Sequence, residues 1–144
     1  MTTQLAASDV ARQVETVLPG RVIEATDGAL VVRPQAVFEV ARWLKSNLAF
    51  DFLECMTAVD YLQHFEVVYC LLSVSRNHRL TLKARLPGRE GLHIPSVTPL
   101  WQGADFQERE AYDLFGIQFD GHPFMKRLFL WEGFPGHPLR KDFL

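Results

Sequence analysis

The sequence predicts an α+β fold, in which helices pack against a mostly antiparallel sheet in a single domain with an irregular C-terminal extension. Three observations support this prediction. An apolar stripe at helical spacing runs through residues 37–48, two strand-like segments flank a connection of hairpin length at 75–78, and regular periodicity ends at Gly116. We therefore divide the chain into a globular domain, residues 1–116, and an irregular docking segment, residues 117–144.

The N-terminal residues predict a helix and then a hairpin. Ser8 is a suitable N-cap, and apolar residues recur after it at helical spacing until a Pro-Gly pair ends the pattern. Two short apolar runs follow, at 21–25 and 29–32. Asp27-Gly28 lies between them, and Asp-Gly readily adopts the positive φ angles of a tight turn, so we expect a β-hairpin.

A second helix has the clearest amphipathic pattern in the chain. Pro34 suits its first turn, because the proline ring presets a helical φ angle. Its apolar stripe must face a core and consists of Val37, Val40, Ala41, Leu44 and Leu48.

Three strand-like segments follow this helix. In 52–59 and 65–74 the apolar residues fall on both alternating faces, as in central strands that are covered on two sides. In 79–86 they alternate with basic residues, which predicts a strand with one apolar face and one basic outer face. The connection at 75–78 is short enough for the second and third strands to pair antiparallel.

The last predicted helix covers residues 104–115 and directs a carboxylate toward apolar surroundings. On a helical wheel, Glu108 falls at the centre of the apolar cluster. Two explanations are open. Asp105 and Glu108 have the spacing of a capping box, in which the glutamate folds back onto a backbone N–H. Alternatively, Glu108 is buried and paired with Arg127 or Arg140, because an unpaired buried carboxylate would be neutralised.

Composition excludes several classes of protein. With 48% hydrophobic and 22% charged residues the chain has a globular composition. Its longest uncharged apolar run, 67–74, is far shorter than the roughly 20 residues that span a bilayer. The formal net charge of −2 does not indicate a nucleic-acid partner. The N-terminus lacks the basic and apolar regions of a secretory signal, so we expect a cytosolic or equivalent compartment.

The cysteines do not indicate a redox centre. Cys55 and Cys70 lie in apolar surroundings and are interpreted as buried thiols rather than as a disulfide. Two cysteines are too few for an iron–sulfur cluster, which commonly takes four thiolates. The glycine patterns of dinucleotide and triphosphate sites are absent from the sequence, as is a nucleophile elbow.

Charge is distributed unevenly along the chain. Residues 76–90 contain five basic residues against one acidic residue, and residues 105–120 contain five acidic residues against one basic residue. The two stretches could attract each other or bind separate partners. The simpler interpretation is that both are solvated faces of neighbouring elements.

The five histidines do not indicate a metal site, because none forms an i, i+4 pair on a predicted helix or lies within a few residues of a cysteine. His122 and His137 each stand between a glycine and a proline, a context typical of residues that fix a turn. A free-standing enzyme that uses Glu108, His122 and His137 as acid–base groups is a remote alternative, since spacing alone does not show that these residues lie close together.

Residues 117–144 combine glycines and prolines with many aromatic side chains. Such a segment cannot cheaply stay in water, so we expect it to dock on a partner. The core-building elements are expected to precede Gly116, and removal of the segment to leave the domain folded. Within the segment, Arg140 and Lys141 are expected to insert into the interface, with Arg140 contributing little to the stability of the isolated domain.

An ordered block of residues within 108–143 resembles a known signature. The block consists of Glu108-Arg109-Glu110-Ala111-Tyr112-Asp113-Leu114-Phe115-Gly116-Ile117, Phe119, Gly121-His122-Pro123, Arg127-Leu128 and Gly136-His137-Pro138-Leu139-Arg140-Lys141-Asp142-Phe143. It resembles the 30-kDa subunit of respiratory complex I, the NADH-quinone oxidoreductase. The resemblance implies partner-docking or structural roles for Glu108, Arg109, Glu110, Tyr112, Asp113, Phe115, Gly116, Gly121, His122, Pro123, Arg127, Gly136, His137, Pro138, Leu139, Arg140, Lys141, Asp142 and Phe143.

The resemblance implies a hydrophilic scaffold subunit that has no cofactor and no catalysis of its own. NADH, flavin, iron–sulfur clusters and quinone are then expected in partner subunits. The expected partners are the large hydrogenase-like subunit of the quinone module and the neighbouring iron–sulfur subunits, with no nucleic acid. Membrane contact is expected only through the complex, on the inner face of an energy-coupling membrane, which is the cytoplasmic side in a prokaryote.

Related subunits occur in other complexes, so two assignments stay open beside complex I. One is the equivalent subunit of an NDH-like complex that takes electrons from ferredoxin. The other is a subunit of an ion-translocating membrane-bound hydrogenase.

Overall fold

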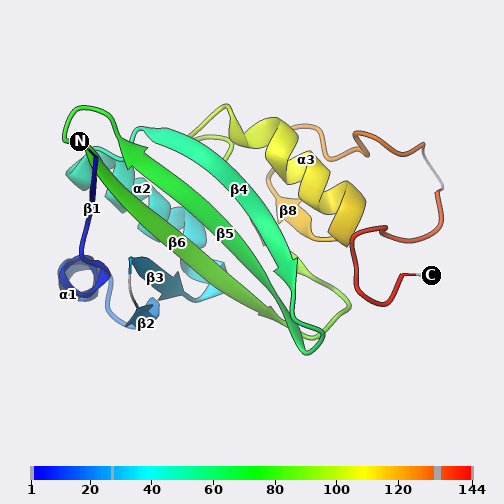
Figure 1. Cartoon of the computed structure of the whole chain (residues 1–144), viewed down its shortest axis with the longest axis horizontal. Helices are drawn as coiled ribbons and strands as arrows, with labels where there is room; N and C mark the ends of the chain where they lie inside the picture. Colours follow the sequence, from blue (N-terminus) through cyan, green and yellow to red (C-terminus); the bar gives the residue numbers. More distant parts are fainter. Residues whose placement is uncertain (1, 27, 132–133, 144) are drawn as a thin grey trace.

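The computed structural model of the chain describes residues 2–26, 28–131 and 134–143. Its elements are β1 (Thr3–Gln4), α1 (Ala7–Val17), β2 (Val22–Thr26), β3 (Ala29–Val32), the 3-10 helix η1 (Pro34–Ala36), α2 (Val37–Leu48), β4 (Phe52–Asp60), β5 (His64–Ser73), β6 (His78–Pro87), β7 (His93–Pro95), α3 (Ala104–Phe115) and β8 (Gln118–Asp120). This arrangement confirms the predicted α+β class (Figure 1).

The main sheet has the strand order β2-β3-β6-β5-β4, and β1 pairs with β6 outside this path. The strands β4, β5 and β6 pair antiparallel, as do β2 and β3, whereas β3 runs parallel to β6. The predicted antiparallel pairing across 75–78 is therefore confirmed, and β5 is an internal strand as predicted.

The core lies on one face of this sheet. Figure 1 shows α2 behind strands β4 to β6 and α3 alongside β4. The inward residues of β6 are those predicted from its alternation, Leu80, Leu82, Ala84 and Leu86, and all are buried. They pack with the buried α2 residues Val37, Val40, Ala41 and Leu44, which confirms the predicted apolar stripe. Burial of this surface is the main stabilising contribution to the fold.

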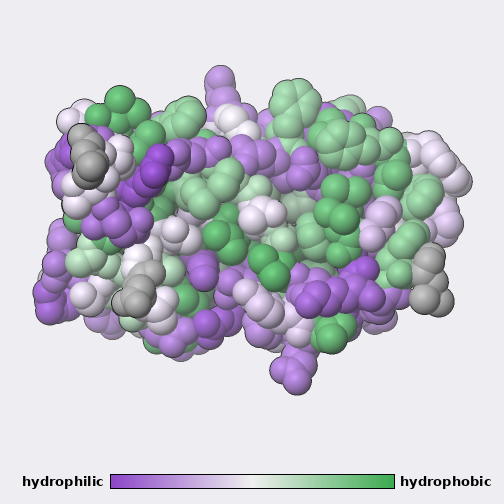
Figure 2. Space-filling model, in the orientation of Figure 1, coloured by the Kyte–Doolittle hydropathy of each residue, from purple (hydrophilic) through white to green (hydrophobic). Residues whose placement is uncertain are grey.

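The opposite face of the sheet carries no helix in the described structure and faces the viewer in Figure 1. Figure 2 shows it in the same orientation, with hydrophobic residues over the strands beside bands of hydrophilic residues. The basic residues predicted for the outer face of β6 pair with carboxylates here. Arg79 contacts Glu54, and both Lys83 and Arg85 contact Glu66.

The strand β4 corrects two predictions. It lies at the edge of the sheet and is not a central strand. A β-bulge between Leu53 and Cys55 gives β4 one more residue than β5 at this point, so Glu54 and Cys55 both face outward. Cys55 is therefore exposed and Cys70 half-buried, and the prediction of buried thiols is wrong; both cysteines are free, as predicted.

The N-terminal elements form largely as predicted. Ser8 is not the N-cap, because α1 begins at Ala7 with Ala6 in the capping position and no side-chain cap. The hairpin of β2 and β3 is confirmed, and Gly28 has a φ of +71° at its turn. Asp27, the other residue of the predicted turn, lies outside the described residues.

A small parallel sheet, β7 paired with β8, follows the main sheet and was not predicted. Phe119 in β8 and Ile117 just before it lie in the core, where they are 2% and 0% exposed. The prediction that every core-building element precedes Gly116 is therefore wrong. Among the described residues, no helix has the length and apolar character needed to cross a membrane.

Candidate interaction site formed by α3 and the C-terminal segment

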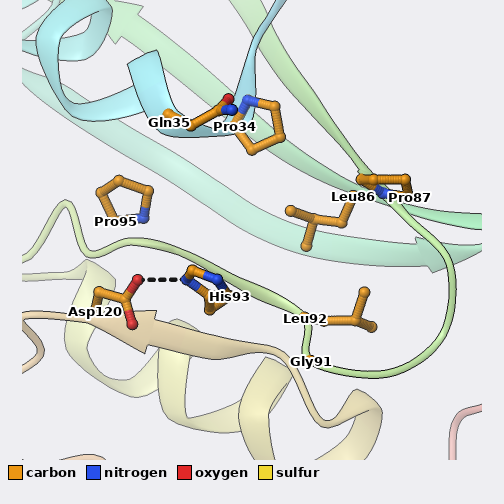
Figure 3. Close-up of a pocket in the computed structure, with 9 residues that line it drawn as sticks. All are labelled: Pro34, Gln35, Leu86, Pro87, Gly91, Leu92, His93, Pro95 and Asp120. Atoms are coloured by element: carbon orange, nitrogen blue, oxygen red, sulfur yellow. Dashed lines mark hydrogen bonds and ion pairs between the residues drawn. The ribbon is translucent and has the colours of Figure 1, made fainter.

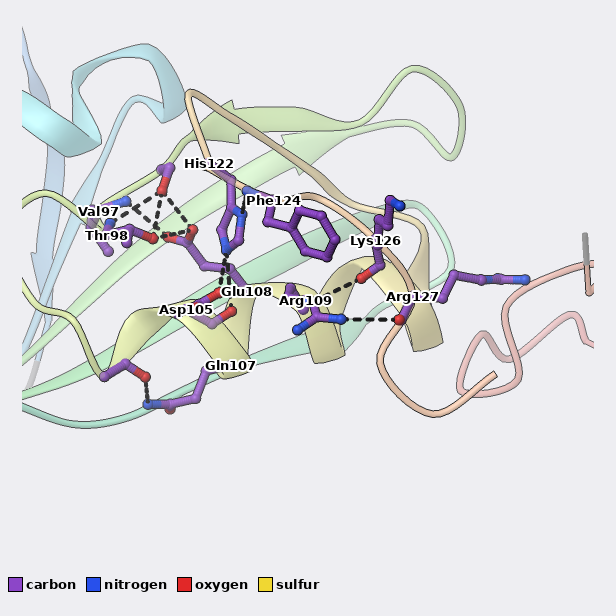
Figure 4. Close-up of polar contacts among 12 residues, drawn as sticks. Val97, Thr98, Asp105, Gln107, Glu108, Arg109, His122, Phe124, Lys126 and Arg127 are labelled. Atoms are coloured by element: carbon purple, nitrogen blue, oxygen red, sulfur yellow. Dashed lines mark hydrogen bonds and ion pairs between the residues drawn. The ribbon is translucent and has the colours of Figure 1, made fainter. Parts of the chain in front are cut away.

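The described residues of 121–143, called here the C-terminal segment, follow one side of α3. Three charged residues of α3 contact this segment at i, i+4 and i+8, which places them on one stripe of the helix: Asp105, Arg109 and Asp113. Figure 4 shows the first two of them with the side chains that they meet. The helix thus anchors the segment at three successive points.

The first anchor is a buried histidine. The Nε2 atom of His122 lies 2.9 Å from Asp105 Oδ1, and its Nδ1 accepts the backbone N–H of Phe124 at 2.9 Å. Gly121 has a φ of +85°, a backbone conformation that favours glycine. The prediction that His122 fixes a turn is confirmed.

The second anchor is Arg109, which binds backbone rather than carboxylate. Its Nε donates to the carbonyl of Lys126 at 3.0 Å, and a terminal nitrogen donates to the carbonyl of Arg127 at 3.2 Å. Its guanidinium also lies 5.5 Å from the ring centroid of Phe124. A planar guanidinium suits such a paired contact with two carbonyl groups.

The third anchor is the buried ion pair of Asp113 and Arg127. Arg127 Nε lies 2.9 Å from Asp113 Oδ1, and the side chains of Arg127 and Asp113 are 9% and 0% exposed. Asp113 Oδ2 accepts the backbone N–H groups of residues 128, 129 and 130, at 3.3, 2.8 and 3.1 Å. One carboxylate therefore holds both a side chain and a turn of the segment.

Arg127 also ties the two parts of the segment together. Its terminal nitrogens donate to the carbonyl groups of Phe134 at 2.5 Å, Gly136 at 2.6 Å and Asp113 at 3.1 Å. His137 Nδ1 lies 3.0 Å from the same Asp113 carbonyl. Gly136 has a φ of +90°, so the predicted turn at His137 is confirmed.

The end of α3 is closed by the segment itself. Gly116 has a φ of +80°, and a Cβ placed there would lie 2.7 Å from His137 and 2.8 Å from Arg140, so only glycine fits. Arg140 Nε donates to the carbonyl of Phe115 at 2.6 Å, and the backbone N–H of Leu139 donates to the carbonyl of Leu114 at 2.9 Å. Arg140 therefore contacts its own domain, a contact that the predicted small contribution to domain stability did not include.

Asp60 and Arg89 hold the last described residues, although neither was predicted to belong to the site. Arg89 forms a bidentate pair with Asp60 at 2.7 and 2.8 Å and also contacts Asp142 at 3.0 Å. The backbone N–H of Lys141 donates to Asp60 at 2.8 Å. The Arg89 hydrogen bond holds the pKa of the Asp60 carboxyl well below its ordinary value, so this clamp stays charged.

Glu108 is buried, as the second of the two explanations offered for it requires. Its Oε1 accepts from the hydroxyl groups of Ser96 at 2.6 Å and Thr98 at 3.1 Å, and its Oε2 accepts from the N–H of Val97 at 2.8 Å (Figure 4). The capping box with Asp105 is wrong, because the N-cap is Gly103 and no side chain caps α3.

Pairing of Glu108 with an arginine is also wrong, because Arg127 binds Asp113 and Arg140 binds the Phe115 carbonyl. Burial raises the pKa of Glu108 above its ordinary value, and the three hydrogen bonds that it accepts offset this only in part. Glu108 thus fastens the 96–98 loop to α3, and its carboxyl group holds a proton more readily there than in the unfolded chain.

We expect Glu108→Gln to remove a pH dependence of stability. The unfolded carboxyl titrates near 4.5 and the folded one at higher pH, so the folded wild type loses stability as pH rises through the folded pKa. The amide stays neutral and can still accept from Val97 and donate to a hydroxyl. The free energy of unfolding of the variant relative to wild type should therefore increase from pH 4.5 toward neutrality in urea titrations.

Glu110→Gln is the matched control, because Glu110 is exposed on the same helix. Its pH profile should follow that of the wild type. Parallel profiles for Glu108→Gln and wild type would show that Glu108 ionises as readily in the folded chain as in the unfolded one.

The acid–base constellation of the enzyme alternative is not assembled. His122 contacts Asp105 near the start of α3, whereas His137 contacts the Asp113 carbonyl near its end. Glu108 is occupied by the 96–98 loop. In the described part of the chain, no group of three or more His, Cys, Asp or Glu residues could hold a metal ion.

A separate pocket of about 420 Å³ lies between η1, the end of β6 and the β7–β8 pair (Figure 3). His93 Nδ1 lies 2.7 Å from Asp120 Oδ2 at its edge, and Pro34, Leu86 and Leu92 contribute apolar walls. Such a pocket can receive an apolar side chain beside an oriented imidazole. No local sequence pattern indicates this pair, because His93 and Asp120 are far apart in the sequence and meet only where β7 pairs with β8.

The two oppositely charged stretches do not pair with each other in the ion pairs of the described residues. Arg79, Lys83, Arg85 and Arg89 contact carboxylates at other positions, namely Glu54, Glu66, Glu24, Asp60 and Asp142. The acidic stretch contacts the C-terminal segment and His93. Neither stretch is therefore a wholly unpaired charged face.

The anchored segment exposes several large apolar side chains. Phe129 and Trp131 are 64% and 65% exposed, and Phe124 and Leu139 are about half exposed. Among the other predicted site residues, Pro123, Lys141, Asp142 and Phe143 are exposed, and Tyr112 and Pro138 are half-buried. The backbone of the segment is thus held by α3 while its aromatic side chains face solvent.

Comparison with known proteins agrees with the predicted resemblance. A family profile described as "Respiratory-chain NADH dehydrogenase, 30 Kd subunit" matches residues 30–144. An NADH-quinone oxidoreductase subunit of Roseiflexus castenholzii is 46% identical over 121 residues, which cover 81% of this chain and 69% of that subunit. The mitochondrial NADH dehydrogenase (ubiquinone) iron-sulfur protein 3 of Candida albicans is 45% identical over 119 residues, which cover 79% of this chain and 42% of that protein.

Two solved structures share the fold. The trypsin-resistant fragment of Nqo5 superposes with a TM-score of 0.68 at 30% identity, covering 83% of this chain and 99% of the fragment. A chain of a membrane-bound sulfane sulfur reductase, an archaeal respiratory membrane complex, superposes with a TM-score of 0.74 at 26% identity, covering 94% of this chain and 84% of that one. With the profile match extending from β3 through the C-terminal segment, this chain belongs to the family of the 30-kDa subunit of respiratory-chain NADH dehydrogenase.

Proposed function

We propose that this chain is a scaffold subunit, without an electron-transfer cofactor of its own, in the peripheral arm of a membrane-attached NADH:quinone oxidoreductase. It supports electron transfer from NADH to quinone, coupled to ion translocation, by holding other subunits in place. The observation that carries the proposal is the C-terminal segment, whose backbone is anchored while Phe129 and Trp131 face solvent.

An anchored segment with exposed aromatics is suited to binding a protein partner. Large aromatic side chains dominate the binding energy of many interfaces. Because Asp113 and Arg127 already fix the backbone, binding would not have to order it, and the entropy cost of association is lower. The surface therefore has the properties of a preformed docking site.

The proposed partners are the large hydrogenase-like subunit of the quinone module and the neighbouring iron–sulfur subunits. These partners would carry the flavin, the iron–sulfur clusters and the NADH and quinone sites, since two cysteines in this chain cannot supply the four thiolates of a common cluster. The chain would reach the inner, cytoplasmic side of the membrane only through the complex. The exposed aromatics are the surface that we propose for the large subunit.

The sulfane sulfur reductase match supports a second candidate of the same class. Its TM-score of 0.74 indicates that the same fold serves in a respiratory complex with another substrate. A subunit of a ferredoxin-dependent NDH-like complex or of a membrane-bound hydrogenase would use the same scaffold. The identity of 46% to an NADH-quinone oxidoreductase subunit favours the first candidate.

The test is mild detergent extraction of the tagged full chain from its host, followed by identification of the bound subunits. We expect the large quinone-module subunit, iron–sulfur subunits and NADH-dependent quinone reduction in the purified complex. A complex that reduces quinone only with ferredoxin, or whose large subunit retains the cysteines that bind nickel, would support the second candidate. A chain that purifies alone, with turnover of its own, would contradict both.

A double variant tests the docking surface. Phe129→Ala with Trp131→Ala removes two exposed aromatics, and we expect the affinity for the partner to fall about 100-fold or more, since a hot-spot residue contributes at least ~2 kcal/mol. Phe52→Ala is the control, because Phe52 is a similarly exposed aromatic on β4. Equal subunit recovery for the double variant and the control would place the interface elsewhere.

A further inference from the structure

Cys55 and Cys70 face each other across two neighbouring strands. They are directly opposite partners in the antiparallel pairing of β4 with β5, and both are free thiols. The bulge at Glu54 turns Cys55 to the open face of the sheet, where Cys70 also lies. Without the bulge, alternation would direct Cys55 into the core, away from Cys70.

The separation of the two backbones suits a covalent bond between the sulfurs. Opposite residues of antiparallel strands have Cα atoms roughly 4.5–5.5 Å apart. Disulfides join Cα atoms that are roughly 4.4–6.8 Å apart. The neighbouring Cys55 thiol also contributes to the raised pKa of Cys70, as expected for two side chains that lie beside each other.

Solvent and small molecules can reach the pair. Cys55 is exposed, Cys70 is half-buried, and both line a surface hollow of about 440 Å³. The charged groups beside them are Glu54 and Arg79, which pair with each other at 3.1 and 3.2 Å. A small oxidant can therefore approach the thiols from this hollow.

We propose that Cys55 and Cys70 form a redox-active pair, which peroxides oxidise to a disulfide within the chain and which thiol reductants restore. The thiolate of Cys55 attacks one oxygen of hydrogen peroxide, giving a sulfenic acid and hydroxide, and the proton lost by Cys55 converts the hydroxide to water. The sulfur of Cys70 then attacks the sulfenic sulfur, the S–S bond forms, and the departing hydroxyl leaves as water with the Cys70 proton. The two thiols lose two electrons, and one peroxide is reduced to two waters.

The environment assigns the order of the two steps. Partial burial and the neighbouring Cys55 thiol raise the pKa of Cys70 to about 11, so Cys70 keeps its proton in the reduced pair. Cys55, which is more exposed, is the thiol that meets peroxide first.

The oxidised pair would fasten an edge strand. The bond would close the β4–β5 hairpin across its open face, next to the ion pair of Glu54 and Arg79. Because edge strands open more readily than central ones, the cross-link should slow local opening of β4. The proposal concerns this chain alone and does not depend on the complex in which it assembles.

The test uses the reduced full chain and one equivalent of hydrogen peroxide. We expect both thiols to disappear together from a thiol count in denaturant, the chain to lose the mass of two hydrogen atoms and to remain monomeric, and dithiothreitol to reverse these changes. Trypsin leaves both cysteines in one peptide, because no Lys or Arg lies between them. Cleavage after Glu66 separates them, so a linked pair of peptides identifies the bond directly.

Two variants separate the steps without disturbing the core, since both side chains lie on the open face. Cys70→Ser should accumulate a sulfenic acid at Cys55, which dimedone traps, and Cys55→Ser should react with peroxide ~10-fold more slowly than wild type. A wild-type chain that gains oxygen atoms at Cys55, or that forms a disulfide between two chains, would overturn the proposal. The wild-type mass and peptide map decide the question even if a variant fails to fold.

Discussion

A chain that ends at Gly116 should lose its cooperative unfolding transition. Such a truncation removes Ile117 and Phe119, which are fully buried in the core, together with the β8 partner of β7. Loss of buried Ile and Phe side chains costs about 2–5 and 3–5 kcal/mol, against a total stability of about 5–15 kcal/mol for a domain of this size. Circular dichroism during heating should show no sharp transition for the truncated chain.

A second truncation, which ends at Asp120, distinguishes the core from the anchored segment. This chain keeps Ile117 and Phe119 and loses the contacts of Asp60, Asp113 and Phe115 with the segment. We expect it to fold with a lower melting temperature than the full chain. Equal melting of the full chain and the chain that ends at Gly116 would show that neither β8 nor the segment stabilises the domain.

Asp113→Ala should be among the most destabilising single substitutions in the chain. It leaves the guanidinium of Arg127, which is 9% exposed, without its carboxylate, and it removes the acceptor of three backbone N–H groups. Breaking a buried pair by removing one partner costs about 3–5 kcal/mol. Urea titration should therefore give a correspondingly lower free energy of unfolding.

Two comparisons test the cause of that loss. Glu110→Ala, at an exposed position of the same helix, should change stability by less than about 0.5 kcal/mol. Combining Asp113→Ala with Arg127→Met should cost less than the sum of the two single substitutions, because the second change removes the stranded charge. Additive losses in this cycle would mean that Asp113 and Arg127 act independently.

Elements with a regular period could be predicted from the sequence, because the period reports which face of an element is buried. The stripe of α2 and the alternation of β6 are examples, and both are buried as predicted. The predicted helix 104–115 matches α3. The same reasoning fails for β4, because the extra residue of its bulge moves every later side chain to the other face of the sheet. For that reason Cys55 was predicted to be buried although it is exposed.

The partners within the site could not be predicted, since they come from segments with no shared pattern. Burial of Glu108 was one of two explanations that the sequence left open, and its acceptor role depends on the irregular 96–98 loop. The resemblance included Asp113 and Arg127 without indicating that they meet. Asp60 and Arg89 gave no local signal at all, because the fold brings β4 and the loop after β6 together with the last residues of the chain.

The anchors on α3 act mainly on the backbone of the segment. Arg109 binds the carbonyls of residues 126 and 127, Asp113 binds the amides of 128–130, and the Leu114 carbonyl binds the amide of Leu139. Every residue except proline presents the same backbone N–H and carbonyl groups, whatever its side chain. Residues 128–131 can therefore change in identity without changing the path of the chain, so the partner that this surface recognises can diverge while its shape is inherited.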